Sequence, residues 1–158
     1  RRWFDKAAGG KHGGLYGYTG PQSNNQATTA TGMFCRQLDL VPPSDPRMPE
    51  GAQALKMRPM SVSNPAYYYV YYATLALYQH QGPVWVEWND RLKETLPRLQ
   101  NKNGSDSGSW DKGAGHAASG GRVVSTTLAT LSLEVYYRLL PMYGFRNKES
   151  APPPKLKR

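Results

Sequence analysis

Hydrophobic positions recur every three or four residues in separate stretches of the chain, which is the pattern of helices with one buried face. The pattern predicts such helices at about 26–38, 84–99 and 123–140. Asn24 or Asn25 can cap the first of these helices. Farther along, Asp45-Pro46 is a helix start signal, which predicts a short helix that ends near Met57.

The stretch at about 66–80 has a different pattern, because every position from Ala66 to Tyr78 is apolar or aromatic apart from Thr74. A helix that is hydrophobic on every face is normally buried on all sides. The aromatic and β-branched residues also suit a strand. The length of the stretch and its Ala-Thr-Leu-Ala-Leu second half favour a helix, so we expect a buried central helix here.

The remaining stretches have the composition of loops and tails. Residues 9–26 are rich in Gly, Asn, Gln and Tyr, and residues 101–121 are rich in Gly and Ser, which predicts a long exposed loop. Three prolines and a basic end indicate an extended or disordered tail. We therefore divide the chain into an N-terminal loop segment (1–26), a domain of helical hairpins (27–143) and a basic, Pro-rich tail (144–158).

The net charge of the chain is uneven. The 158 residues suit one ordinary domain and include 20 Lys and Arg against 11 Asp and Glu, a net charge of +9. Residues 1–12 carry +3 and residues 146–158 carry +4, so the body between them is close to neutral. A nucleic-acid-binding protein usually gathers its positive charge on one face. Basic ends are more often solubilising or weakly adhesive, so we expect no specific nucleic-acid binding.

Three further features exclude classes of protein or bear on the origin of the chain. The single cysteine, Cys35, excludes an internal disulfide framework and a paired-cysteine zinc or redox site. No stretch reaches the roughly 20 apolar residues that a membrane-spanning helix needs. The chain begins with Arg1 rather than Met and shows no signal-peptide pattern. We therefore expect a fragment, a processed product or a trimmed form of a longer protein. The sequence does not predict its cellular compartment.

Three of the expected helices resemble one another. Ala30-Thr31, Ala73-Thr74 and Thr126-Thr127 align at offsets of 43 and 53 residues. Periods of this size are typical of stacked helical hairpins, in which each unit buries its face against the next. We therefore predict an all-α fold, a stack of about three helical hairpins with long Gly-rich loops.

Two sequence motifs resemble a known superfamily. Gln100 is followed, after seven residues, by Gly108-Ser109-Trp110, which is similar to the Gln…Gly-x-Trp repeat of terpene cyclases and protein prenyltransferases. The segments 71–77 and 120–137 are more similar still to the prenyltransferase/squalene-cyclase repeat proteins of planctomycete-type bacteria. The resemblance covers roughly residues 14–143.

This resemblance implies an α/α toroid, a fold with an inner and an outer ring of helices. It implies that 66–80 and 123–140 are inner helices and that 84–99 is an outer one. Gln100, Gly108 and Trp110 are then structural residues of the repeat. A full toroid needs more hairpins than this chain holds, so the resemblance implies a partial toroid, either a C-terminal half or a piece that closes through another chain.

The residue sets that carry chemistry in this superfamily are missing. Its cyclases use an Asp-x-Asp-Asp acid cluster, which this sequence lacks, and its protein prenyltransferases hold zinc with Asp, Cys and His. Cys35 has no Asp two residues away, and His12, His80 and His116 stand in unrelated contexts. The loop at 101–112 lacks the Gly and Glu that a calcium loop requires. We therefore expect no catalytic residue, no metal site and no cofactor in this chain.

Tyrosines are the remaining candidates for a site, because the 66–78 stretch places several hydroxyl groups around a buried helix. In a toroid with a central hollow, Tyr68 and Tyr72 could line a pocket for an apolar small ligand, with Glu134 and Arg138 as polar anchors. The alternative is that the tyrosines pack between helices and that Glu134 and Arg138 form an ion pair one turn apart. We favour this alternative.

These expectations favour a non-catalytic binding or assembly module. A partial ring of hairpins exposes edges that another copy or a partner protein would cover, so we expect self-association or a protein partner. One alternative is a fragment of a terpene cyclase-like enzyme whose acid motif lies on a missing segment. Another is a protein that binds nucleic acid or an anionic surface through its basic ends.

Overall fold

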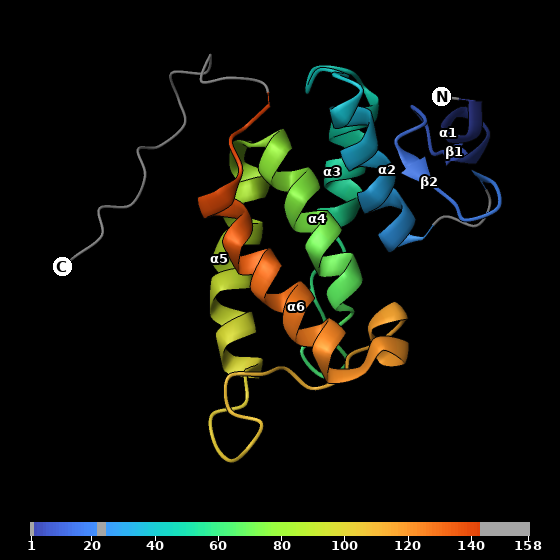
Figure 1. The fold of residues 1–158 in the computed structure, drawn as a ribbon. Helices are drawn as coiled ribbons and strands as arrows, with labels where there is room; N and C mark the ends of the chain where they lie inside the picture. Colours follow the sequence, from blue (N-terminus) through green and yellow to red (C-terminus); the bar gives the residue numbers. More distant parts are fainter. Residues whose placement is uncertain (1, 22–24, 143–158) are drawn as a thin grey trace.

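Helix α4 (Tyr67–His80) lies at the centre of the fold, with α2 (Gln26–Leu38) on one side and α6 (His116–Arg138) on the other (Figure 1). The structure, a computed structural model, describes residues 2–21 and 25–142. Helices α3 (Arg47–Lys56) and α5 (Gly82–Leu99) complete the helical body. The expected tail at 144–158 lies outside the described residues.

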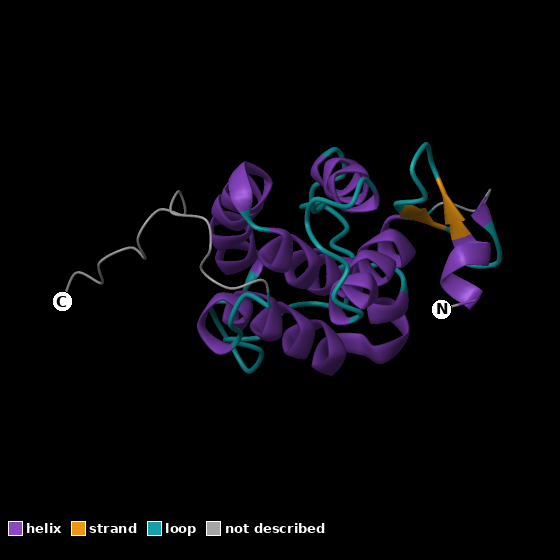
Figure 2. Ribbon diagram, turned by 90° about the horizontal axis from the view of Figure 1, so that it is seen from above, coloured by secondary structure: helices purple, strands orange, loops and turns teal. Residues whose placement is uncertain are grey.

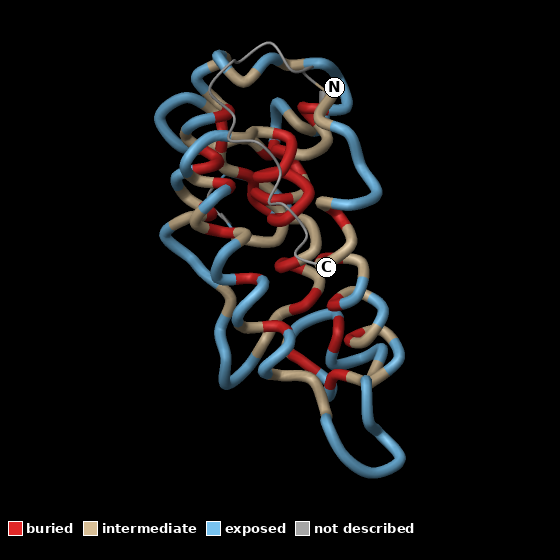
Figure 3. The backbone as a smooth tube through the Cα atoms, turned by 90° about the vertical axis from the view of Figure 1, so that its left-hand side faces the viewer, coloured by how far each residue is buried: buried red, intermediate tan, exposed pale blue. Residues whose placement is uncertain are grey.

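The helices that the sequence predicted at about 26–38, 46–57, 66–80 and 84–99 are confirmed as α2, α3, α4 and α5. The side chain of Asn25 caps α2 by accepting hydrogen bonds from two main-chain N–H groups of its first turn. In α4, Val70, Ala73, Ala76 and Leu77 are completely buried, so the hydrophobic stretch is a central helix. Figure 3 shows the buried positions concentrated where the helices meet.

Helices α2, α4 and α6 run in the same direction. The ring of Tyr68 lies 5.0 Å from that of His116 where α4 and α6 begin, and the ring of Tyr78 lies 6.5 Å from that of Tyr136 where both end. Near the ends of α2 and α4, the Gln37 amide donates to the Ala76 carbonyl at 2.9 Å. The first turns of the three helices are therefore at the same end of the molecule.

The N-terminal segment differs from the loop that the composition predicts. It forms a short helix, α1 (Arg2–Ala7), and an antiparallel ribbon of β1 (Ala8–Gly9) and β2 (Leu15–Tyr16), which lies beside the helical body (Figure 2). The fold is therefore mostly helical, with six helices among the described residues and a small two-stranded sheet, rather than all-α.

Helix α6 also differs from the prediction at both ends. It begins at His116, within the stretch expected to be a loop, and Gly121, whose φ is +66°, breaks it into two helical pieces. It ends at Arg138 rather than near residue 140, because Tyr78 and Gln79 of α4 donate hydrogen bonds to the carbonyl groups of Leu139 and Leu140. The sequence predicted about three helical hairpins. Within the described residues there are two, α2–α3 and α4–α5, and they are followed by α6, which has no second helix after it to complete a third hairpin.

Candidate functional site

A partly open cavity of about 440 Å³ lies where α1, α2 and α4 meet the loop that leads into α6. Its volume is within the range of roughly 300–1,000 Å³ that is common for small-molecule sites. We call it the aromatic cavity. Its lining consists of the aromatic Trp3, Phe4, Tyr18, Tyr68, Tyr69 and His116, the polar Asn25, Gln26, Thr28 and Thr31, and the small Ala27, Gly32, Ala66, Ala114 and Gly115.

Arg36 of α2 positions the N-terminal wall of the aromatic cavity. Its buried guanidinium group donates to the Tyr16 hydroxyl at 3.1 Å and forms an ion pair with Asp5 at 2.6 Å. The same group lies 5.5 Å from the centre of the Phe4 ring, within the range of a cation–π contact. The hydrogen bond from Arg36 holds the pKa of Asp5 below its ordinary value. These contacts fix α1 against α2 and so place Trp3 and Phe4 at the cavity.

Strand β2 is held by side chains from the first turn of α2. The Tyr16 N–H donates to the Thr29 hydroxyl at 3.0 Å, and the Thr28 hydroxyl donates to the Tyr16 carbonyl at 2.6 Å. Gly32 leaves room for the Tyr16 ring, because a Cβ at this position would lie 2.5 Å from two ring atoms. The ribbon thus depends on partners in α2 that the local sequence of the N-terminal segment does not reveal.

The wall of the aromatic cavity formed by α4 includes one of the two predicted pocket tyrosines. The ring of Tyr68 lines the cavity and lies 4.8 Å from the ring of Tyr72, one turn later. Tyr72 is not among the lining residues, and burial raises the pKa of its hydroxyl above the ordinary value. The hydroxyl of Tyr69 donates to the main-chain carbonyl of Arg58 at 2.5 Å, which anchors this wall to the end of α3.

The two predicted polar anchors lie at the other end of α6. Arg138 forms an ion pair with Glu134 at 2.7 Å, one turn apart, as the alternative in the sequence analysis expected. Both residues are close in sequence to Tyr136, which packs against Tyr78 at the end of α4 away from the cavity. The structure therefore brings Tyr68 to Tyr72 and Glu134 to Arg138, but it does not bring the two pairs together.

Sequence reasoning missed Trp3, Phe4 and Tyr18, because all three lie in the segment that was assigned to a loop. The concentration of aromatic residues between Trp3 and Tyr18 was a signal that could have been used, since aromatic side chains in a short segment usually find a surface to pack on. The partners that turn this segment into a cavity wall come from α2 and α4.

The three repeat-motif residues are brought together at the end of α5. The Gln100 side chain donates to the carbonyl oxygen of Gly108 at 2.8 Å, and the indole N–H of Trp110 donates to the carbonyl oxygen of Leu96 at the same distance. The φ of Gly108 is +85°, a conformation that favours glycine. The buried Trp110 therefore closes the loop over the helix end.

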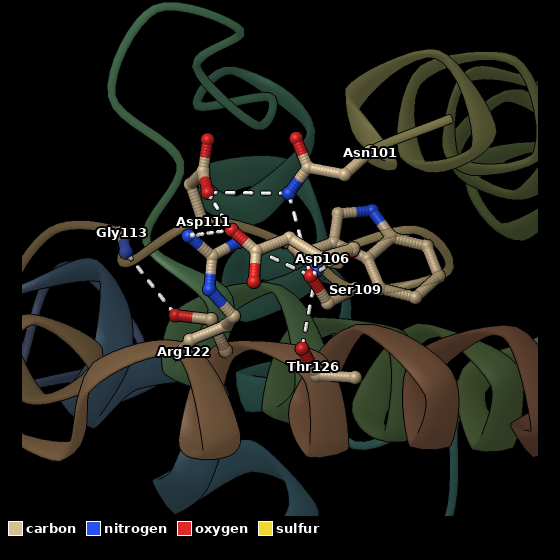
Figure 4. A network of polar contacts seen from close by, with 9 residues as sticks. Asn101, Asp106, Ser109, Asp111, Gly113, Arg122 and Thr126 are labelled. Atoms are coloured by element: carbon tan, nitrogen blue, oxygen red, sulfur yellow. Dashed lines mark hydrogen bonds and ion pairs between the residues drawn. The ribbon is translucent and has the colours of Figure 1, made fainter. Parts of the chain in front are cut away.

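A polar network then ties this loop to the start of the long piece of α6 (Figure 4). Arg122 forms ion pairs with Asp111 at 2.5 Å and with Asp106 at 3.2 Å, and it donates to the Ser109 hydroxyl at 3.1 Å. Hydrogen bonds from Asn101, and secondarily from Arg122, hold the pKa of Asp111 below its ordinary value. Both carboxylates are thus paired with one cation, an arrangement that fixes the loop.

The glycine-rich loop between the strands surrounds a carboxylate of the same chain. The main-chain N–H groups of Lys11, His12 and Gly14 donate to the two carboxylate oxygens of Glu50 on α3, at 2.6 to 3.2 Å. Converging N–H groups form a concave anion site. In this fold the anion is an internal side chain, and it attaches the ribbon to α3.

The part of the chain that the structure describes contains no group of three or more His, Cys, Asp or Glu side chains that could hold a metal ion. None of the described helices is long and apolar enough to cross a membrane. Comparison with family models, with curated proteins and with solved structures found no match to this chain.

Proposed function

We propose that this chain is a non-catalytic assembly module made of helical hairpins, and that the outward face of α6 binds a further helical unit. This face is a stripe of exposed or half-buried residues that points away from α4 and consists of Val123, Thr127, Thr130, Glu134, Tyr137 and Arg138. Val123 is 77% exposed and Tyr137 76% exposed. The single observation that carries the proposal is this long, exposed helix face, which has no charged residue between Val123 and Thr130 and whose two charged residues, Glu134 and Arg138, are paired with each other.

The exposed face of α5 shows what a solvated helix of this protein looks like. It carries Asp90, Arg91, Lys93, Glu94 and Arg98, and its ion pairs include Glu94–Arg98 one turn apart. A helix face in contact with water normally has this charged composition. On the α6 stripe, by contrast, the charged members are Glu134 and Arg138, which are paired with each other near its end. An exposed face with few charges is a common feature of a protein interface.

The arrangement of the helices supports the same proposal. Helix α4 has a parallel neighbour on each side, α2 and α6, whereas within the described residues α6 has such a neighbour on one side alone. Three parallel helices with α3 and α5 packed outside them also support a partial α/α toroid of the prenyltransferase/squalene-cyclase repeat type. The contact between Gln100 and Gly108 is further support, because it joins two residues of the repeat motif.

We infer that the occupant of the α6 stripe is a second copy of this chain. A twofold interface brings the same patch of both copies together, so it suits a stripe that is uncharged over most of its length. Light scattering after size-exclusion chromatography, over a range of protein concentrations, measures the association directly. We expect the mass to rise from monomer towards dimer with concentration.

Two variants and a matched control locate the interface. Val123→Lys and Tyr137→Lys place charges in the stripe, and each should weaken the association about tenfold or more, since an unpaired buried charge is costly. Val86→Lys adds the same charge on α5, where Val86 is 55% exposed, and should leave the association unchanged. A chain that stays monomeric at every concentration, or an association that all three variants weaken equally, would contradict the proposal.

A further inference from the structure

The aromatic cavity combines two kinds of binding surface. Six aromatic rings supply apolar area, while two carboxamide side chains and the hydroxyl groups of threonine and tyrosine side chains supply hydrogen bonds. None of its lining residues is Lys, Arg, Asp or Glu. Sites of this composition bind molecules whose faces are apolar and whose edges are polar.

Two aromatic side chains of the cavity lining are exposed over much of their surface. Trp3 is 53% exposed and Tyr18 is 71% exposed, although each belongs to the lining. Deeper in the cavity, the half-buried ring of Tyr68 is supported by Tyr72 and His116. A ligand ring that lies against Trp3 and Tyr18 would bury their exposed apolar area, which is the main source of binding free energy at such sites.

The polar side chains of the cavity keep hydrogen-bonding capacity. Asn25 uses its side-chain oxygen to cap α2, which leaves the side-chain NH₂ group for a ligand. Gln26 also lines the cavity, and its side chain has no hydrogen bond with the described residues. No side chain caps the first turn of α4, so the main-chain N–H groups of this turn can also donate to a ligand. These groups fit a ligand with several oxygen atoms.

We propose that the aromatic cavity binds a neutral carbohydrate, with the C–H face of a pyranose ring against Trp3 and Tyr18 and its hydroxyl groups bonded to Asn25 and Gln26. Among the described lining residues, a phosphate or carboxylate ligand finds no cationic side chain, and a cationic ligand finds no carboxylate. A hydrocarbon would bury the amide groups without partners, which costs free energy. A neutral sugar satisfies both the rings and the amides.

The test titrates the complete chain with neutral oligosaccharides of glucose, galactose and N-acetylglucosamine, three to four units long, and measures heat and tryptophan fluorescence. Farnesol, inorganic phosphate and choline serve as comparison probes for the apolar, anionic and cationic alternatives. Trp85, Trp88 and Trp110 are buried, so a shift of the emission to shorter wavelength on binding reports mainly on Trp3. We expect at least one oligosaccharide to bind with a dissociation constant in the millimolar range or tighter and to shift the emission.

Variants decide whether the cavity is the site. Trp3→Ala and Gln26→Ala should each weaken calorimetric binding about tenfold, and Trp3→Phe should keep most of the affinity while it removes the fluorescence shift. Tyr137→Ala removes a similarly exposed aromatic residue outside the cavity, at the far end of α6, and should leave oligosaccharide binding unchanged, whatever it does to self-association. Circular dichroism and thermal unfolding show that each variant is folded.

Several results would overturn the proposal. The first is that no oligosaccharide binds. The second is that Trp3→Ala and Gln26→Ala leave binding unchanged. The third is that farnesol, phosphate or choline binds more tightly than every sugar. The inference does not rest on the proposed assembly, because the α6 stripe is outside the cavity lining. Val123→Lys should bind the oligosaccharide as the unaltered chain does, so failure of either proposal can be recognised without the other.

Discussion

The indole N–H of Trp110 donates a hydrogen bond to the main-chain carbonyl of Leu96 at 2.8 Å. Leu96 is one of the last four residues of α5, whose carbonyl groups have no partner within the helix. A residue fourteen positions later thus completes the end of the helix, and the loop between them is closed by main-chain hydrogen bonds between Asn101 and Gly108 and between Asn101 and Ser109.

Replacing Trp110 with Phe should lower the free energy of unfolding by about 1–3 kcal/mol, because the buried carbonyl of Leu96 loses its donor. The measurement is urea denaturation followed by circular dichroism. Trp3→Phe removes an indole N–H from a half-exposed ring and should change stability by no more than about 0.5 kcal/mol. Equal losses in the two variants would show that the Leu96 contact has no special importance.

Replacing Glu50 with Ala should lower the free energy of unfolding by about 1–2 kcal/mol, since three main-chain N–H groups lose their acceptor. The amides of residues 11–14 should also exchange with deuterium faster, which hydrogen-exchange mass spectrometry detects. Glu94→Ala, which removes an exposed ion pair with Arg98, is the matched control and should change stability by less than about 0.5 kcal/mol. An unchanged exchange rate in Glu50→Ala would argue against a structural role for the loop contact.

Replacing Gly32 with Ala sets two effects against each other. Ala is favoured over Gly inside a helix by up to about 1 kcal/mol, but the new Cβ would lie 2.5 Å from the ring of Tyr16. Tyr16 is buried and its hydroxyl is held by Arg36, so the ring has little freedom to move. Overpacking should win, with a net loss of about 1–2 kcal/mol in urea denaturation.

The control for this position is Gln53→Ala, on the exposed face of α3, where the helix preference acts without a clash. It should leave the protein as stable as before or slightly more stable. A gain in stability in Gly32→Ala as well would mean that the Tyr16 ring can move aside.

Acidification should destabilise the fold through His80. Burial lowers the pKa of His80 below its ordinary value of 6.5, and its buried Nδ1 has no hydrogen-bond partner in the described part of the chain. Below pH 6.5 the unfolded chain takes up a proton at this position before the folded chain does, so the free energy of unfolding falls as the pH falls. Well above pH 6.5, His80 is neutral in both states, so it should make no contribution to the pH dependence of the free energy of unfolding.

Urea denaturation between pH 7.5 and 5 measures this effect, and His80→Gln should flatten the profile. The ion-paired carboxylates stay charged over the same range, because Arg47 lowers the pKa of Asp45 to about 2 and Arg36 lowers that of Asp5. A slope that survives in His80→Gln would assign the effect to another group.

Replacing Arg122 with Gln should loosen the loop between α5 and α6. The variant removes the cation that pairs with Asp106 and Asp111, so trypsin should cleave after Lys102 and Lys112 several times faster. Gel analysis of a digestion time course measures the rate. Arg98→Gln, which breaks an exposed pair on α5, should leave cleavage at these two lysines unchanged.

The positions of α2 to α5 could be predicted from the sequence because their signals are local. The side chain of Asn25 caps α2 within its own first turn, and Pro46 precedes α3 directly. The Glu134–Arg138 pair follows from spacing on one helix. In the candidate site, the sequence singled out Tyr68 from its place in an aromatic helix, and Tyr68 is among the residues that line the cavity.

The rest of the site depends on residues that are distant in the sequence. Thr28 and Thr29 of α2 turn the expected N-terminal loop into a strand, and Arg36 brings Phe4 to the cavity from more than thirty residues away. By itself, therefore, the sequence determined helices α2 to α5 and the charged face of α5, because periodicity, caps and breaks act between near neighbours. Only the tertiary structure decided where α6 begins and ends, which tyrosine faces a cavity and what the glycine loop binds, because these contacts exist only once distant segments pack together.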